Sequence, residues 1–235
     1  MVVFRPSEER GHVDSGWLKS AHSFSFGDYF DRNHMNVSVL RVINDDVIAA
    51  GGGFATHPHD NMEIITYVLQ GELAHKDSMG NGSVIRPGEI QHMSAGSGIT
   101  HSEFNPSDEN ETHLLQIWML PNKRDVKPQY QGLELSDEER QGQWKILASP
   151  DGRQGSLAIH CEGVLLNTLL SQGDELSYEL ADDRVAYLHV AQGQIRFNGR
   201  KMNSGDAATI YPESLIALEG LETSDVLLFD LPKES

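Results

Sequence analysis

The chain has 235 residues, with 35 acidic against 18 basic side chains and a formal net charge of −17. Because nucleic acids and anionic membrane surfaces select basic proteins, this charge argues against direct contact with either. Cys161 is the single cysteine, which excludes an intrachain disulfide, and no apolar run approaches the ~20 residues that span a bilayer. We therefore expect a cytoplasmic protein.

Residues 20–30 form the first distinctive segment, which is rich in aromatic side chains. It contains His22, Phe24, Phe26, Tyr29 and Phe30. Aromatic side chains at alternate positions can lie over a pocket mouth and stack on a planar ligand. Packing beneath an N-terminal strand is the simpler interpretation, so we expect most of them in the core and one or two at a cavity.

The following hundred residues have the pattern of an all-β domain. Short apolar runs alternate with turn signals such as Met79-Gly80-Asn81-Gly82 and Arg86-Pro87-Gly88-Glu89. Many short strands at close spacing indicate a sandwich or barrel. The predicted strands in this part cover residues 37–43, 64–69, 72–77, 83–85, 91–94 and 113–119.

Two short motifs in this domain carry the types of side chain that bind metals. His57-Pro58-His59 and His101-Ser102-Glu103 each have two such residues at alternate positions. In a strand, alternate side chains share one face, so two neighbouring strands would direct three imidazoles and one carboxylate to one point. This donor set suits a mid-series divalent metal and leaves coordination positions for substrate. The alternatives are solvated histidines beside a surface carboxylate, or a closed structural site of the kind zinc forms.

A connector and a second β-rich half follow. Within the connector, residues 120–143, Ser136 and Glu139 match a capping box and predict a short helix. Cys161 has a neighbouring histidine, His160, but adjacent strand residues point apart, so we interpret it as an ordinary thiol. The strands predicted in this half cover residues 145–148, 155–160, 163–170, 177–180, 185–191, 194–197, 207–210 and 226–231.

The second half repeats part of the first. Val68-Leu69-Gln70-Gly71-Glu72-Leu73 has a counterpart in Val190-Ala191-Gln192-Gly193-Gln194-Ile195, and each is followed by a glycine-acid turn. Such an internal repeat suggests a duplicated architecture. No His-x-His or His-x-Glu accompanies the second copy, so we expect a second module without the metal site.

The sequence resembles the cupin superfamily, and within it the pirin family. Gly51-x5-His57-x-His59-x3-Glu63 resembles the first cupin motif, and Gly88-x5-Ser94-x-Gly96 with His101-x3-Asn105 resembles the second. Residues 23–29, 57–67, 72–81 and 95–103 are similar to pirin, and the second half is similar to the C-terminal cupin of bacterial pirin-like quercetinases. The resemblance implies an all-β bicupin fold, two tandem cupin β-barrels or β-sandwiches with few short helices, divided into residues 1–132 and 133–235.

The resemblance also implies His57, His59, His101 and Glu103 as the ligands of one divalent metal. A general cupin takes its glutamate ligand from the first motif, but Glu63 is one step out of register because seven residues rather than six separate it from Gly71. A one-residue shift turns a side chain to the other face of a strand, so we interpret Glu63 as a framework residue. Among the remaining histidines of this half, His75, His92 and His113, we expect His92 to approach the pocket.

By resemblance, the expected activity is that of a quercetin 2,3-dioxygenase, which cleaves a flavonol or a related planar, enolic small molecule with O2. The implied metal is Fe(II), while the ligand types also admit Ni, Co, Mn, Cu or Zn. Glu103 is nominated as the catalytic base as well as a ligand, and a monomer is the default. The alternatives are a metal- or redox-responsive regulatory protein that binds a protein partner, and another cupin reaction such as isomerisation.

Overall fold

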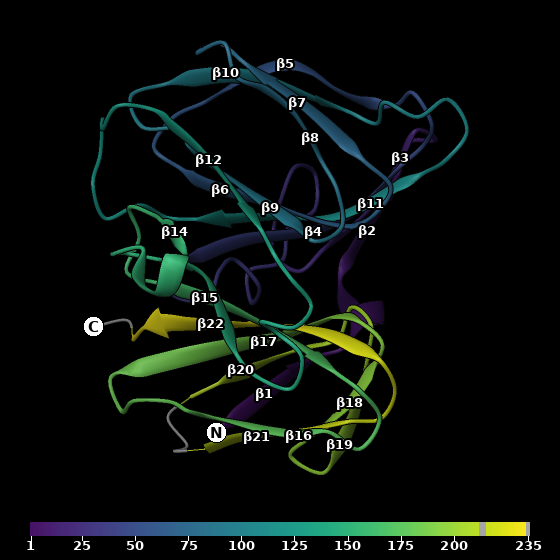
Figure 1. The fold of residues 1–235 in the computed structure, drawn as a ribbon, viewed down its shortest axis with the longest axis vertical. Helices are drawn as coiled ribbons and strands as arrows, with labels where there is room; N and C mark the ends of the chain where they lie inside the picture. The colour runs from purple at the N-terminus through teal and green to yellow at the C-terminus, as the bar shows by residue number, and fades with distance from the viewer. Residues whose placement is uncertain (212–214, 234–235) are drawn as a thin grey trace.

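The computed structural model describes residues 1–211 and 215–233 and confirms the predicted all-β, two-barrel architecture. Two halves are stacked on one another, and each combines one seven-stranded with one four-stranded sheet (Figure 1). In the part of the chain so described, helical structure is limited to two 3-10 turns, Ser7–Glu9 and Arg153–Gly155. No helix in that part has the length and apolar character that a membrane crossing requires.

The first half carries the segments with the metal-binding motifs. Its large sheet has the strand order β12 (Gln129–Glu134), β9 (Glu89–Ser94), β6 (Glu63–Gln70), β11 (Thr112–Met119), β4 (Leu40–Ile48), β3 (Leu18–His22) and β2 (Gly11–Asp14). Its small sheet has the order β5 (Gly53–His59), β10 (Ile99–Phe104), β7 (Leu73–Asp77) and β8 (Gly82–Ile85). The small sheet lies on the side of this half that faces away from the second half (Figure 1).

The second half has the same plan. Its large sheet runs β1 (Val2–Arg5), β20 (Ala207–Ile210), β17 (Arg184–Gln192), β22 (Ser224–Pro232), β15 (Val164–Leu170), β13 (Lys145–Ser149) and β14 (Leu157–Ala158). Its small sheet runs β16 (Glu175–Glu179), β21 (Leu215–Gly220), β18 (Gln194–Phe197) and β19 (Arg200–Asn203). Gly71 and Gly193 occupy the equivalent turns after β6 and β17, both at positive φ and both against backbone that leaves no room for a Cβ.

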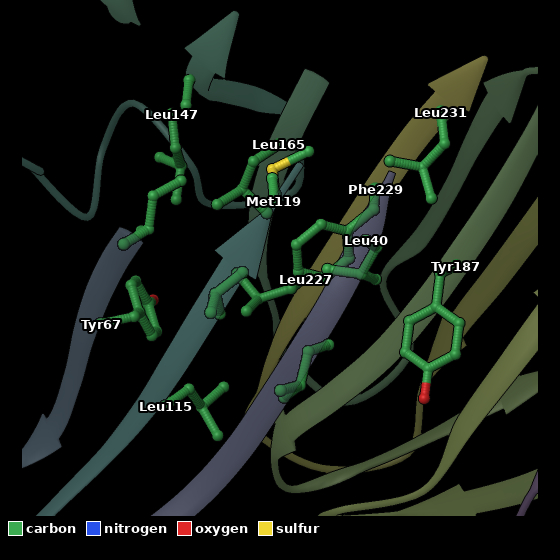
Figure 2. Packing of buried hydrophobic residues seen from close by; sticks show 14 of the residues in the cluster. Leu40, Tyr67, Leu115, Met119, Leu147, Leu165, Tyr187, Leu227, Phe229 and Leu231 are labelled. Atoms are coloured by element: carbon green, nitrogen blue, oxygen red, sulfur yellow. The ribbon is translucent and has the colours of Figure 1, made fainter. Parts of the chain in front are cut away.

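The large sheets of the two halves face each other across a shared apolar core. On β6, Ile65 and Tyr67 point into this core, whereas Ile64, Thr66 and Val68 have the opposite parity and face the interior of the first barrel. Figure 2 shows side chains of the first half, such as Met119, packed against those of the second half, such as Phe229. Burial of this interface holds the two halves together.

The interiors of the two barrels differ in chemistry. The second barrel is filled with apolar side chains, including Leu188, Val190 and Ile216. The first contains a row of buried polar residues, including Asn44, Thr66 and Gln116. Among the residues that the structure describes, those of the first barrel therefore offer the environment in which a polar reaction centre could be held.

Several local predictions were wrong. Residues 136–139 form a turn rather than a helix, although Ser136 Oγ accepts a hydrogen bond from the Glu139 backbone N–H at 3.3 Å, as a capping residue would. The strand predicted at residues 155–160 is reduced to Leu157–Ala158. Strand β12 lies in the predicted connector. The domain boundary at residue 132 stays a prediction. Strand β1, which precedes that boundary in the chain, pairs with β20 in the sheet of the second half.

Candidate metal centre

Strands β5 and β10 pair side by side and bring the two motifs together. His57 lies directly opposite His101 in the antiparallel register, and His59 lies opposite Ile99. The ring centroids are 4.5 Å apart for His57 and His101, 4.8 Å for His57 and His59, and 4.9 Å for His59 and His101. One ring nitrogen from each of the three histidines lies within 4.8 Å of the others.

Glu103 joins this cluster through His101. It has the same strand parity as His101, and with His101 and His75 it forms a second group whose ligand atoms lie within 4.8 Å of one another. The four residues predicted as ligands therefore fall into two overlapping groups that share His101. Both groups that the described residues contain lie in the first barrel.

The Glu103 carboxylate is held from two strands of the large sheet. Gln116 Nε2 on β11 donates to its Oε2 at 2.9 Å, and Thr66 Oγ1 on β6 donates to its Oε1 at 3.4 Å. Burial raises the pKa of Glu103 to about 7, which the hydrogen bond from Gln116 partly opposes. A carboxylate oxygen has more than one lone-pair site, so each can accept a hydrogen bond and still face a cation or a proton.

Burial holds two of the histidines, His59 and His101, in the neutral form that binds metals. Burial lowers the pKa of His59 to about 4 and that of His101 to about 3, and His57 adds a smaller electrostatic contribution in both cases. His57 Nδ1 lies 2.8 Å from the carbonyl oxygen of Ala55, which favours the tautomer with the proton on Nδ1 and leaves Nε2 as the donor atom.

A divalent cation fits this donor set. The Nε2 atom of His101 is buried and has no hydrogen-bond partner, which is costly unless something else binds it. Its Nδ1 atom lies 3.4 Å from Nδ1 of His75, so Nε2 is the atom left for a metal. Three imidazoles and one carboxylate are a common ligand set for mid-series divalent ions.

A pocket of about 280 Å³ opens beside the histidines. Its walls combine aromatic, aliphatic and polar side chains. The residues that line it in addition to the histidines and Glu103 are Phe26, Asn44, Asp46, Phe54, Ile64, Gln116 and Trp118. Trp118 packs edge-on against His59 with ring centroids 4.9 Å apart. The site is therefore open to a small planar molecule that can reach the histidine nitrogens.

Glu63 faces away from the cluster, as the register argument predicted. Its carboxylate accepts hydrogen bonds from His92 Nε2 at 2.7 Å, from Ser94 Oγ at 2.6 Å and from the His160 backbone at 3.1 Å. It thereby links the first half to the second. Ile64, the next residue along β6, lines the pocket instead.

The prediction for His92 was wrong. His92 bonds to Glu63 on the face of the large sheet that packs against the second half, while His75 lies next to His101. His113 pairs with Asp45 at 2.6 Å, away from the pocket. Cys161 is buried, and burial raises its pKa to about 12, so it has no nucleophilic character.

The aromatic segment bears out the prediction only in part, because one side chain reaches the pocket as expected but most of the others do not belong to the core. Phe24 is buried in the shared core, and Phe26 lines the pocket, whereas Phe30 is exposed. The pocket residues Asn44, Asp46 and Trp118 were not predicted from the sequence. Gln116 is a polar residue in the otherwise apolar centre of the strand at residues 112–119. A polar side chain in such a position is the sequence signal that could have indicated the polar side of the pocket.

Comparison with known proteins gives consistent results over the whole length. The Pirin family model matches residues 3–119, and a model described as the quercetinase C-terminal cupin domain matches residues 146–231. A protein of Escherichia coli (strain K12) named quercetin 2,3-dioxygenase is 45% identical over 232 residues, covering 99% of each chain. A pirin-like protein of Caulobacter vibrioides is 39% identical over 231 residues, covering 98% of this chain and 99% of that one.

The structural comparison agrees. The crystal structure of the bacterial pirin YhhW of Escherichia coli in complex with nickel(II) superimposes with a TM-score of 0.95 at 44% identity, and the alignment covers 100% of both chains. A quercetin 2,3-dioxygenase of Acinetobacter baumannii shares the fold at 21% identity and a TM-score of 0.78. With both halves matched in sequence and in architecture, the chain belongs to the pirin family of bicupin proteins.

Proposed function

We propose that this protein is a metal-dependent dioxygenase that cleaves a flavonol, or a related planar enolic molecule, at a site formed by His57, His59, His101 and Glu103. The observation that carries the proposal is the convergence of three imidazoles on an accessible pocket with aromatic walls. Relatives that are similar over the full length and named quercetin 2,3-dioxygenase support the same reaction class.

The side chains of the pocket suit this chemistry. A divalent cation bound there would act as a Lewis acid and lower the pKa of a flavonol 3-hydroxyl. Glu103 is the group that would accept the hydroxyl proton, since it lies beside His101 and is already oriented by Gln116 and Thr66. Phe26, Phe54 and Trp118 would hold the planar rings and exclude water. Both oxygen atoms of O2 enter the ring-opened product, and one substrate carbon leaves as carbon monoxide.

The proposed metal is Fe(II), and the donor set accepts other mid-series ions as well. A full-length relative has been crystallised in complex with nickel(II). Elemental analysis of protein purified without added metal identifies the ion that the cell supplies. We expect about one equivalent of a transition metal in the wild type and a large loss in His59→Ala.

Oxygen consumption tests the reaction. The protein is loaded anaerobically with Fe(II) and mixed with quercetin in air-saturated buffer, while an oxygen electrode and a carbon monoxide assay follow turnover. Uptake of oxygen and release of carbon monoxide in equal amounts, both absent in His59→Ala, are expected. Metal-loaded protein that consumes no oxygen would contradict the proposal and leave the regulatory, partner-binding role as the better explanation.

A further inference from the structure

One wall of the pocket carries hydrogen-bond acceptors that the protein itself does not satisfy. Asn44 and Asp46 are each 4% exposed, and the Oδ1 atom of each is buried without a hydrogen-bond partner. Both residues line the pocket beside the histidines. Leaving a buried acceptor unpaired costs free energy, so two at one site call for an occupant.

The strand pairing shows how these acceptors are arranged relative to Glu103. On β4 and β11, Asn44 lies opposite Gln116, and Asp46 lies opposite Leu114. Gln116 in turn donates to Glu103. The acceptors therefore continue the polar row that begins at Glu103 and extend it along β4. The hydroxyl of Ser20, opposite Asp46 on β3, is close enough to lower the pKa of the Asp46 carboxyl but lies outside hydrogen-bonding geometry to its Oδ1 atom, so it does not complete the row.

The chemistry of the wall points to neutral hydroxyl donors. An amide oxygen and a carboxylate oxygen both accept hydrogen bonds, and a cationic ligand would be repelled by a divalent ion in the adjacent histidine cluster. The pocket also has aromatic walls, with Trp118 on the same sheet as Asn44 and Phe26 edge-to-face with it at 5.3 Å between ring centroids. A planar aromatic ring that carries hydroxyl groups satisfies both kinds of wall.

We propose that Asn44 and Asp46 form a subsite that binds the ring hydroxyl groups of a polyhydroxylated aromatic substrate and so selects it over its less hydroxylated analogues. Alternate residues on a strand are about 7 Å apart, which is too far to serve two adjacent hydroxyls of one ring, so the two acceptors bind hydroxyls at separate positions. This inference rests on the proposed function, because it assigns the other end of the substrate to the metal.

The test compares two ligands that share the metal-binding end. Quercetin and 3-hydroxyflavone both carry the 3-hydroxyl and 4-carbonyl groups, but only quercetin has further hydroxyls. Each is titrated under argon into Zn(II)-loaded protein, which binds without turnover, and affinity is measured by calorimetry. Wild-type protein is expected to bind quercetin at least about tenfold more tightly, the scale of one or two hydrogen bonds. Equal affinities would overturn the subsite without reference to any variant.

Variants then assign the preference to the two residues. Asn44→Leu and Asp46→Leu are each expected to lower quercetin affinity about tenfold and to leave 3-hydroxyflavone within about twofold. Asp46→Asn retains an acceptor oxygen and should recover most of the affinity. Ile64→Val, on the same pocket wall, is the matched control and should affect both ligands equally.

The possible results test the subsite and the proposed dioxygenase activity separately. Equal loss of both ligands in Asn44→Leu and Asp46→Leu would mean that the variants disturb the pocket as a whole, and no loss of quercetin would mean that the acceptors bind only water. Either result would reject the subsite. If the Zn(II) protein discriminates as expected but the Fe(II) protein consumes no oxygen, the subsite stands and the dioxygenase proposal fails. Binding of neither ligand would reject both.

Discussion

At the scale of single residues, the site depends on the side chains behind the proposed ligands. Gln116 and Thr66 each donate to one oxygen of Glu103, and they come from neighbouring strands of the large sheet. The single hydroxyl proton of Thr66 is shared between Glu103 Oε1 and Gln116 Oε1, which accepts it at 3.3 Å, so Thr66 is tied to both residues. The orientation of Glu103 is therefore set by the floor of the barrel as well as by its own strand.

We predict that Gln116→Leu weakens metal binding by about tenfold or more, the scale seen when groups that orient metal ligands are removed. The change deletes the 2.9 Å hydrogen bond to Glu103 while keeping a side chain of similar size. Competition with a chromophoric chelator measures the affinity. Gln131→Leu removes a glutamine that binds the Ala158 carbonyl outside the pocket, and a comparable loss of metal in that control would contradict the explanation.

At the scale of elements, the close pairing of β5 and β10 creates the cluster. Their register shifts between His101 and Glu103, so that Glu103 lies opposite Phe54. Next to this register shift, Gly53 on β5 allows the two strands to approach closely. A Cβ at this position would lie 2.4 Å from the Glu103 carbonyl oxygen on β10. The position of Glu103 thus depends on a glycine in the neighbouring strand.

Gly53→Ala should therefore disturb the metal site more than the fold. We expect β10 to move away from β5 at Glu103, with a loss of metal affinity of about tenfold and a far-ultraviolet circular dichroism spectrum like that of the wild type. Gly82→Ala is the matched control in the same sheet, because a Cβ there meets nothing closer than the His75 carbonyl oxygen at 3.9 Å. Equal metal affinity in the two variants would refute the argument.

Strand periodicity explains which parts of this arrangement were predictable. The parity of His57, His59, His101 and Glu103 within their own strands follows from local alternation, as does the direction of Glu63 away from the interior of the first barrel. His92 could not be assigned in this way, because its direction depends on the pairing of Ile65 with His92 across β6 and β9. Strand β12, with the sequence Gln-Tyr-Gln-Gly-Leu-Glu, was missed because only its pairing with β9 makes it a strand.

At the scale of the whole molecule, the two halves share one architecture, but the candidate metal centre lies in the first and the second has an apolar interior. The strand orders of the two halves correspond throughout, but the positions equivalent to the ligand strands, β16 and β21, contribute apolar side chains such as Tyr178 and Ile216 to the core of the second barrel. The second barrel therefore gives the first a rigid, apolar base. Buried polar contacts across the interface add specificity to that packing.

Tyr67 is the clearest such contact. Its hydroxyl donates to Asp225 Oδ2 at 2.6 Å and accepts from Arg140 Nη1 at 2.9 Å, joining β6 to the second half. Tyr67→Phe leaves both buried partners short of a hydrogen bond, so we expect a loss of about 1–3 kcal/mol in the free energy of unfolding. Urea titration measures it. Tyr187→Phe is the control, since the buried Tyr187 hydroxyl lies near Ser23 but outside hydrogen-bonding geometry, and an equal loss there would disprove the role of the contact.

His189, in the same interface, should make stability depend on pH. It is completely buried, both ring nitrogens lack a partner, and burial lowers its pKa to about 4, assisted by Arg10 and opposed by Asp45 and Asp206. Between pH 6.5 and 4 the unfolded chain binds a proton at this residue and the folded chain does not, so its contribution to stability falls as pH falls, by about 3 kcal/mol over the window.

Replacing this imidazole tests that dependence. His189→Leu should flatten the dependence of the unfolding free energy on pH between 6.5 and 4, measured by urea titration at several pH values. The exposed His12 supplies the control, because His12→Leu removes an imidazole that folding does not bury. If His189→Leu retained the wild-type slope, the interface would not be where the acid sensitivity arises, and protonation within the first barrel would have to account for it.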